Sequence, residues 1–280
     1  MKRRKFGRHN KIPYFSIAVI ILFLIIGVFG QYIAPYDATK ADLSSKLLPP
    51  AFIKGGSSAY LFGTDEMGRD VLSRMIAGGR VSLFVSLSAI IVGGGVGTIL
   101  GIVAGYFGRT AEGIISRLTD ASLAFPSILL ALLLSLSIGP GEKATIISIA
   151  FSMWAKYTRT VKSDVILLKN TNYVTQAKIM GAGKLWIIRK HILPNIRKML
   201  VVMVSLEIGM AIITEASLGF LGLSVVPPTP SWGTMIADGK NYFLTGWWVS
   251  VFPTIATVLT ALSFQKFGEW IRDRRKDANE

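Results

Sequence analysis

The sequence predicts an all-α polytopic membrane protein with six transmembrane helices and both termini in the cytoplasm. Two observations support this prediction. Of the 280 residues, 51% are hydrophobic and only 17% are charged, whereas about a quarter of the residues in a soluble domain are charged. The charge is also unevenly placed, because long stretches hold no ionisable residue and basic residues crowd the segments between them. This alternation is typical of several membrane spans rather than of one soluble core.

Composition also excludes several function classes. A net charge of +15 would suit a nucleic-acid-binding protein, but that function needs a water-facing basic patch on a folded scaffold. Here the basic residues flank apolar runs, so we expect the lipid bilayer as partner and no nucleic acid. The absence of cysteine excludes disulfides and thiol catalysis. No nucleophile, base and orienting group recur at a recognisable spacing, so we expect no enzyme, no metal site and no cofactor bound by this chain.

Apolar stretches of about 20 residues mark the spans in order. The first, residues 13–34, follows a basic tail and lacks an A-x-A-like cleavage site, so we expect a retained anchor. The other predicted spans are residues 81–108, 121–138, 144–155, 199–220 and 247–264. Pro126 is expected to bend the third span, and Gly139-Pro140-Gly141 predicts a helical hairpin before the fourth. Lys156 cuts the fourth span short, and its amine can reach the interface.

The orientation follows from the distribution of basic residues. Residues 1–12 contain six basic residues and no acidic one, and residues 156–198 contain ten basic residues against one acidic residue. Residues 35–79 carry five of each sign. Because basic loops stay on the cytoplasmic side, the tail 1–12, the loop 156–198 and the tail 266–280 are predicted to be cytoplasmic, and residues 35–79 extracytoplasmic. The permease core, with the last five spans, is predicted to cover residues 80–265.

Four glycines form a stripe along the second predicted span. They recur at intervals of four, at Gly93, Gly97, Gly101 and Gly105, and therefore lie on one helix face. Without side chains there, a neighbouring helix can approach closely. We predict either ordinary close packing or a helix that lines or hinges a translocation path.

A helix–glycine–helix elbow is predicted between the fourth and fifth spans. Residues 173–180 read as a short helix, and Gly181 and Gly183 are natural stops where a residue without Cβ can adopt left-handed geometry. A second helix over residues 184–192 is expected to end before Pro194. The elbow is too polar to span a membrane, so it either rests on anionic headgroups or contacts another protein.

This elbow resembles the EAA loop of ABC importer permeases. Residues 173–183 read Tyr-Val-Thr-Gln-Ala-Lys-Ile-Met-Gly-Ala-Gly, and residues 189–195 read Arg-Lys-His-Ile-Leu-Pro-Asn. These two runs are similar to the family's sequence pattern, which is Glu-Ala-Ala, three residues, Gly, nine residues, Ile, any residue and then Leu-Pro. The sequence departs from it at Thr175, Gln176 and His191, where the family has Glu, Ala and Ile. The resemblance implies coupling helices that dock into a groove on an ATPase subunit. The residues that it assigns to this loop are Thr175, Gln176, Ala177, Gly181, Leu193 and Pro194.

Three further segments resemble the dipeptide/oligopeptide/nickel permeases: residues 62–74, residues 215–223 with 227–233, and residues 268–273. The resemblance implies the C-type permease of a bacterial cell-membrane importer with type I ABC importer architecture. It further implies a B-type permease, two ATPase subunits that use ATP-Mg, and an extracytoplasmic substrate-binding protein as partners. The expected substrate is a peptide, with nickel or a metallophore–metal complex as the alternative.

Acidic residues at two places in the sequence are candidate sites. Glu207 and Glu215 fall within the fifth predicted span, where a carboxylate is costly and usually faces a cavity or a partner. Eight residues apart, they share a similar helix face, so they are predicted either on the substrate path or in hydrogen bonds to the partner permease. Asp65, Glu66 and Asp70 lack the spacing of an EF-hand loop. They predict a solvated acidic turn in which Asp65 caps the following helix.

Two other classes of membrane protein remain as alternatives. An ion-driven carrier would show inverted repeats, broken helices and buried ion ligands, and the sequence has no convincing internal repeat. A structural scaffold would leave the elbow unexplained. Neighbouring genes for an ATPase and a lipoprotein would favour the importer.

Overall fold

The computed structural model describes residues 12–277, which form helices joined by turns and loops. The all-α prediction is confirmed for this range. In chain order the α-helices are α1 Tyr14–Ile33, α2 Val71–Phe107, α3 Arg109–Leu123, α4 Ser127–Ile138, α5 Glu142–Lys169, α6 Asn172–Ile179, α7 Lys184–Ile187, α8 Leu193–Phe220, α9 Trp232–Lys240 and α10 Trp248–Asp277. A short 3₁₀ turn, Leu43–Ser45, lies between α1 and α2, and a π-helical turn, Ile188–Ile192, joins α7 to α8.

Four helical stretches in the described range are long and apolar enough to cross a membrane. They are α1, α2, the continuous run from Lys184 to Phe220, and α10. The count rises to five if α3 and α4, which meet at a bend of 90°, together form one span. Helix α5 is long enough but not apolar enough to be counted among these stretches, because Lys156, Arg159 and neighbouring charges interrupt its apolar sequence. Several candidate spans are therefore confirmed: four are continuous helices, a fifth depends on the bent pair α3–α4, and the total of six remains a prediction.

The third and fourth predicted spans differ most from the structure. Residues 121–138 are not one helix, because α3 ends at Leu123 and α4 begins at Ser127 after an extended Pro126 (ψ 126°). Proline has no N–H for the helix ladder and its ring clashes with the preceding turn, so the bend expected at Pro126 is a complete break. The hairpin that follows is confirmed, because Gly139 and Gly141 have φ of 96° and 144°. Helix α5 then continues through Lys156 to Lys169.

Two other helices are longer than the sequence predicts. Helix α2 begins at Val71 instead of Val81, because the Asp70 side chain accepts a hydrogen bond of 2.8 Å from the backbone N–H of Ser73. Asp70 rather than Asp65 is thus the N-cap. Helix α10 continues past Phe264 to Asp277, so most of the predicted C-terminal tail is an extension of the last helix.

The glycine stripe of α2 packs directly against α5, which confirms the close-packing prediction. A Cβ built on Gly101 would lie 2.7 Å from Cβ of Val161, and one on Gly105 would lie 2.8 Å from Cβ of Val165. Real Cβ atoms essentially never approach other atoms this closely. At Gly97 the helices are also joined by a hydrogen bond of 3.2 Å from the Thr158 hydroxyl to the Gly97 carbonyl. A hinge or path-lining role for this stripe remains a prediction.

We expect Gly97→Ala to destabilise the protein and Gly95→Ala to have little effect. The new methyl at Gly97 would lie 2.6 Å from Cβ of Tyr157, whereas nothing lies within 4 Å of a methyl at Gly95. Overpacking a close helix contact lowers the free energy of unfolding by about 1–3 kcal/mol. Alanine improves helix propensity at both positions, so propensity does not account for a difference between the two variants. Thermal unfolding of the detergent-purified variants measures the difference. Equal melting temperatures for the two variants would mean that the α2–α5 contact tolerates added bulk.

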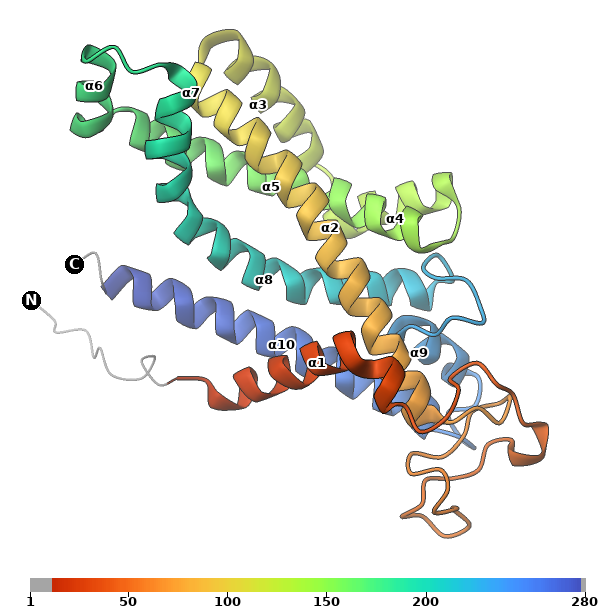
Figure 1. The fold of residues 1–280 in the computed structure, drawn as a ribbon. Coiled ribbons are helices and arrows are strands. Elements are labelled where there is room, and N and C mark those ends of the chain that lie inside the picture. Colours follow the sequence, from red (N-terminus) through yellow and green to blue (C-terminus); the bar gives the residue numbers. More distant parts are fainter. Residues whose placement is uncertain (1–11, 278–280) are drawn as a thin grey trace, which may run out of the picture.

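The helices place the functional segments at two opposite ends of the molecule (Figure 1). The elbow formed by α6 and α7 lies at the same end as the first residues of α1 and the last residues of α10. The long segment between α1 and α2 lies at the other end, together with α9 and the loop that follows α8. A backbone hydrogen bond of 2.8 Å from Gly141 to Ser224 ties the α4–α5 hairpin to that loop.

Candidate functional site

The elbow is a compact reversal between α6 and α7. Helix α6 ends where Gly181 adopts a φ of 84°, a left-handed conformation that only glycine adopts without strain. The N–H of Ala182 donates a 3.0 Å hydrogen bond to the carbonyl of Ala177, which closes the helix end. The predicted stop at Gly181 is confirmed. Gly183 has a φ of −66° and is the N-cap of α7, so the left-handed role predicted for it is wrong.

The second arm of the elbow is continuous with α8, contrary to the prediction that it ends before Pro194. A π-helical turn, Ile188–Ile192, precedes the proline, and the N–H of Leu193 bonds to the carbonyl of Ile188, five residues back. This wider turn accommodates a ring that has no N–H and would clash within a regular α-helix. The second arm of the elbow and the fifth predicted span therefore belong to one helical run, Lys184–Phe220.

The elbow buries one face and exposes another. Val174 and Ala177 of α6 are buried and belong to the same hydrophobic cluster as Ile187 and Ile192. Ala177, one of the residues that the resemblance assigns to this loop, is only 3% exposed, so its side chain is buried within this chain. The other assigned residues are exposed: Thr175, Gln176, Gly181, Leu193 and Pro194.

Large apolar side chains project into solvent at the tip of the elbow. Ile179 and Met180, at the end of α6, are each 81% exposed, and Leu185 and Trp186 of α7 are 67% and 49% exposed. Sequence reasoning missed these residues, because they fall outside the matched motif positions. Their signal was nonetheless present as apolar residues inside an otherwise basic segment. Exposed apolar clusters of this kind are typical of surfaces that contact another protein or a membrane, and we call this cluster the elbow tip (Ile179, Met180, Leu185 and Trp186).

His191 stabilises the elbow from inside. Its ring lies 5.6 Å from the ring of Tyr173 and 5.1 Å from the ring of Trp186. It thereby holds α6 to α7 through aromatic contacts.

The two carboxylates of α8 have partners within the chain. Glu215 is fully buried and accepts hydrogen bonds of 2.8 Å from the hydroxyl of Ser82 in α2 and from the hydroxyl of Ser224 in the loop after α8. Glu207 is 6% exposed and pairs with the amine of Lys156 in α5. The two share a helix but contact different neighbours. For Glu215, the hydrogen bonds predicted to a partner permease are made inside this chain.

We expect Glu215→Ala to lower the melting temperature more than Glu215→Gln. Alanine leaves two buried hydroxyls without an acceptor, which lowers the free energy of unfolding by about 1–3 kcal/mol for each unsatisfied group. It also leaves a cavity beside α2. Glutamine keeps the shape and can still accept from one serine. Ser217→Ala is the matched control, since the Ser217 hydroxyl bonds back to its own helix at the carbonyl of Ile213. A melting temperature for Glu215→Ala as high as that of the control would contradict a structural role.

At the opposite end of the molecule, the predicted acidic turn is a buried ion cluster. Asp65 is 1% exposed and lies 2.7 Å from Nε of Arg69 and 3.2 Å from Nε of Arg74. Arg69 also reaches Glu66 at 3.0 Å, and Nη2 of Arg74 lies 3.2 Å from Asp238 of α9. The predicted solvated turn is therefore wrong, because the two arginines draw the carboxylates into the interior.

The two less buried carboxylates of this cluster have perturbed acidities. Burial raises the pKa of the Glu66 carboxyl, and the neighbouring Asp65 carboxylate raises it further. Burial also raises the pKa of Asp238, although Arg74 and Arg69 oppose that shift. Both groups therefore lose their charge at a higher pH than an exposed carboxylate would.

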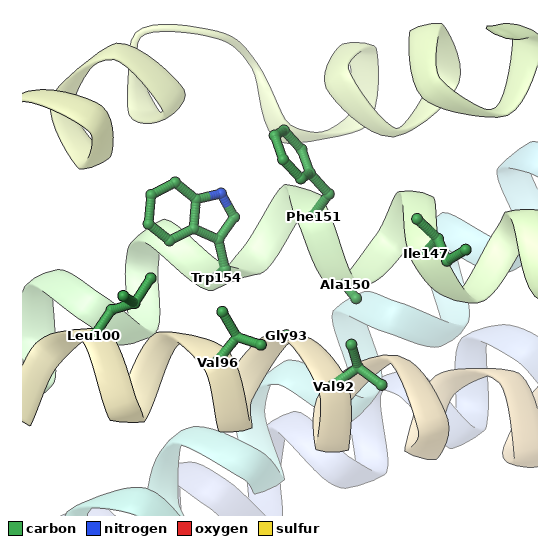
Figure 2. A pocket seen from close by; sticks show the side chains of 8 residues that line it. All are labelled: Val92, Gly93, Val96, Leu100, Ile147, Ala150, Phe151 and Trp154. Carbon is green, nitrogen blue, oxygen red and sulfur yellow. The ribbon is translucent and has the colours of Figure 1, made fainter. Parts of the chain in front are cut away.

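A separate groove of about 330 Å³ lies between α2 and α5 (Figure 2). Val92, Val96 and Leu100 reach it from α2, and Phe151 and Trp154 from α5. The lining is apolar apart from the indole N–H of Trp154, so the groove offers no charged partner for a polar solute. It suits hydrocarbon, as expected for a surface within a bilayer.

Helical spans, an elbow continuous with one of them, and an exposed apolar tip define the class of this chain as a membrane protein with an apolar surface outside its spans. Known families agree with this class. Residues 97–277 match the family described as binding-protein-dependent transport system inner membrane component. Residues 3–50 match the N-terminal transmembrane domain of oligopeptide transport permease C. The chain belongs to the binding-protein-dependent transport system inner membrane component family and is an integral inner-membrane protein.

Individual relatives cover nearly the whole chain. The chain is 40% identical over 266 residues, 95% of its own length and 89% of the relative, to the dipeptide transport system permease protein DppC of Escherichia coli strain K12. It is 38% identical over 265 residues to the di/tripeptide transport system permease protein DppC of Pseudomonas aeruginosa, with coverage of 95% and 88%. It is 36% identical over 273 residues to the glutathione transport system permease protein GsiD of Pectobacterium atrosepticum, with coverage of 96% and 89%.

Proposed function

We propose that this chain is the C-type permease subunit of an ATP-driven ABC importer and forms half of the translocation path for peptides. The elbow tip is the observation that carries the proposal. Four large apolar side chains on a basic segment are exposed to solvent, and their helix is continuous with a span. That arrangement suits a subunit that receives mechanical work from a second protein rather than generating it.

The proposal names the other components of the importer. ATP-Mg is bound and hydrolysed by two separate ATPase subunits, one of which docks on the elbow tip, and this chain itself binds no cofactor. A B-type permease completes the path, and an extracytoplasmic binding protein delivers the substrate. Peptides are favoured over nickel because the relatives described above are named for dipeptides, di/tripeptides and glutathione.

We further propose six spans with both termini in the cytoplasm. The bent pair α3–α4 would supply the third crossing and α5 the fourth. The chief obstacle to placing α5 in a membrane is the charge of Lys156, and its pairing with Glu207 of α8 lowers the cost of both charges. The grouping of the elbow with the start of α1 and the end of α10 at one end of the molecule (Figure 1) supports this orientation.

Cysteine labelling tests the orientation. A cysteine at Ser57 or Thr229 should react with an impermeant thiol reagent in intact cells, because both positions lie at the end opposite the elbow. A cysteine at Gly183 should react only after the membrane is permeabilised. The native chain contains no cysteine, so each variant reports a single site. Labelling of the Gly183 position in intact cells would reverse the proposed topology.

Uptake into vesicles tests the function. The complex would be isolated through a tag on this chain, reconstituted with its binding protein, and supplied with ATP inside the vesicles and radiolabelled dialanine outside. We expect ATP-dependent accumulation of dialanine and none of ⁶³Ni²⁺ in parallel vesicles. Accumulation of nickel without dialanine would replace the peptide assignment with the nickel alternative.

A further inference from the structure

The ion pair between Lys156 of α5 and Glu207 of α8 lies at membrane depth. Glu207 belongs to the helical run Lys184–Phe220, which is long and apolar enough to cross a membrane. It lies about 12 Å along the helix from Met199, where the predicted apolar stretch begins. Its carboxylate holds the Lys156 amine at the same depth, although the Lys156 side chain is 58% exposed. Because hydrocarbon does not solvate a charge, water or protein covers this part of the surface, and lipid does not.

A cavity of about 230 Å³ adjoins this ion pair where α8 lies beside α10 (Figure 1). Lys156 and Glu207 line it together with Gln265 of α10. Met210 of α8 and Leu262 of α10 also line it, and they are 50% and 49% exposed. The cavity is therefore a hollow in the outer surface of the chain. Charged and amide groups line it, in contrast to the apolar groove between α2 and α5.

Hydroxyl groups extend the polar character of this surface along α5 and α8. Ser152 and Thr160 lie four residues before and after Lys156, and therefore on the same side of α5. Thr214 lies four residues after Met210 on α8. The hydroxyls of Thr160 and Thr214 donate to carbonyls of their own helices, so neither fastens one helix to another. We call these residues the polar face (Ser152, Lys156, Thr160, Glu207, Thr214 and Gln265).

Helix α1 presents a surface of the opposite kind. Residues 17–30 carry no polar side chain, and Ile21, Leu22, Val28 and Phe29 are each more than half exposed. Hydrocarbon offers no hydrogen bonds, so lipid covers a surface of this composition and not one that presents charged and amide groups. The polar face and the exposed side of α1 therefore have different neighbours in the membrane.

Water suits the polar face better than a packed protein interface does. An ammonium has three donors, and Glu207 is the partner that Lys156 contacts within residues 12–277. Sealing the remaining donors under a second protein is costly, and close helix packing in membranes uses small residues rather than long side chains around a hollow. We propose that the polar face lines the aqueous translocation path, where a zwitterionic peptide passes the Lys156–Glu207 pair. This proposal rests on the proposed function and names the residues with which this chain forms its half of the path.

Reaction of single cysteines with a charged reagent tests the proposal, because the native chain contains no cysteine. Met210→Cys and Leu262→Cys place thiols at the cavity. Leu22→Cys is the matched control, since Leu22 is 58% exposed and lies midway along α1. The complex would be held in nanodiscs, with and without ATP and vanadate, and treated with the cationic reagent trimethylammonioethyl methanethiosulfonate. This reagent attacks the thiolate, which forms in water, so the mass of this chain should show both cavity thiols reacting at least tenfold faster than the control in one of the two states.

Modification after folding distinguishes the path from a water-filled hollow elsewhere. The modified Met210→Cys complex, reconstituted into vesicles, should take up dialanine at least tenfold more slowly than the unmodified variant. The added cation narrows the path and repels the ammonium of the peptide. Dithiothreitol, which reduces the mixed disulfide, should restore uptake and thereby show that the variant remained folded.

Three results would overturn the proposal in distinguishable ways. If both cavity thiols react as slowly as the control in both states while wild-type vesicles take up dialanine, lipid or the second permease covers the polar face and the importer stands. Fast modification without loss of uptake would place the hollow in water but outside the path. If wild-type vesicles take up no dialanine, the proposed function itself fails, and the peptide path with it.

Discussion

Replacing Ile179 and Met180 together by aspartate is expected to release the ATPase subunits from the complex. Both side chains are 81% exposed in this chain, so the double variant should fold and insert normally. In the proposed complex they are buried against the ATPase, where each contributes about 1.5–3 kcal/mol. Losing both, and burying two unpaired carboxylates instead, should weaken the contact by at least about 100-fold. Co-purification from membranes through a tag on this chain measures the effect.

The control for this double variant is Leu244→Asp. Leu244 is 96% exposed and lies after α9, at the end of the molecule opposite the elbow. Its replacement introduces one of the two negative charges that the elbow variant adds, on a highly exposed apolar residue, and should leave the ATPase subunits bound. If the elbow variant retains the ATPase subunits as fully as this control does, the elbow tip is not their docking surface.

Gly181→Val is expected to uncouple transport through strain in the elbow turn. Gly181 has a φ of 84°, and a β-branched residue held in this region costs about 1–3 kcal/mol. No atom lies within 4 Å of a Cβ at this position, so the effect comes from the backbone rather than from a clash. The turn should shift to relieve the strain, which displaces α6 relative to α8. We expect peptide-stimulated ATP hydrolysis to fall by at least tenfold.

Gly183→Val is the matched control for the turn variant. Gly183 lies two residues further along the same turn, also has no atom within 4 Å of a built Cβ, and has a φ of −66° that valine adopts freely. It should therefore retain peptide-stimulated hydrolysis. If both variants lose peptide-stimulated ATP hydrolysis to a similar extent, the loss comes from the added side chain and not from strain in the left-handed backbone.

Helix positions were predictable wherever composition changes sharply. The limits of α1 and the end of α8 at Phe220 follow from apolar runs, and the contact of the glycine stripe with a neighbouring helix follows from its period of four. The bounds of α5 were not predictable from hydropathy. Its charged half is helical because it packs on α2 through Val161 and Val165, a tertiary contact that a window of sequence does not contain.

The candidate site was predicted in position but not in detail. The motif located the elbow and its turn at Gly181, but it did not show that α6 turns the side chain of Ala177 inward. The exposed pair Ile179 and Met180 lies between motif positions, and only the helix geometry shows which face is free. The ion cluster was missed for a similar reason, because Asp65 and Asp238 are distant in sequence and meet through Arg74.

Site-specific photocrosslinking from Met180 tests the central claim most directly. Benzoylphenylalanine placed at Met180 in the intact membrane complex should form an adduct with an ATPase subunit on irradiation, whereas the same residue at Leu244 should not. The adduct band should disappear when the ATPase gene is deleted. If irradiation at Met180 yields adducts only with lipid, or none, while the ATPase subunits remain in the complex, the elbow is not the point at which ATP hydrolysis is coupled to this chain.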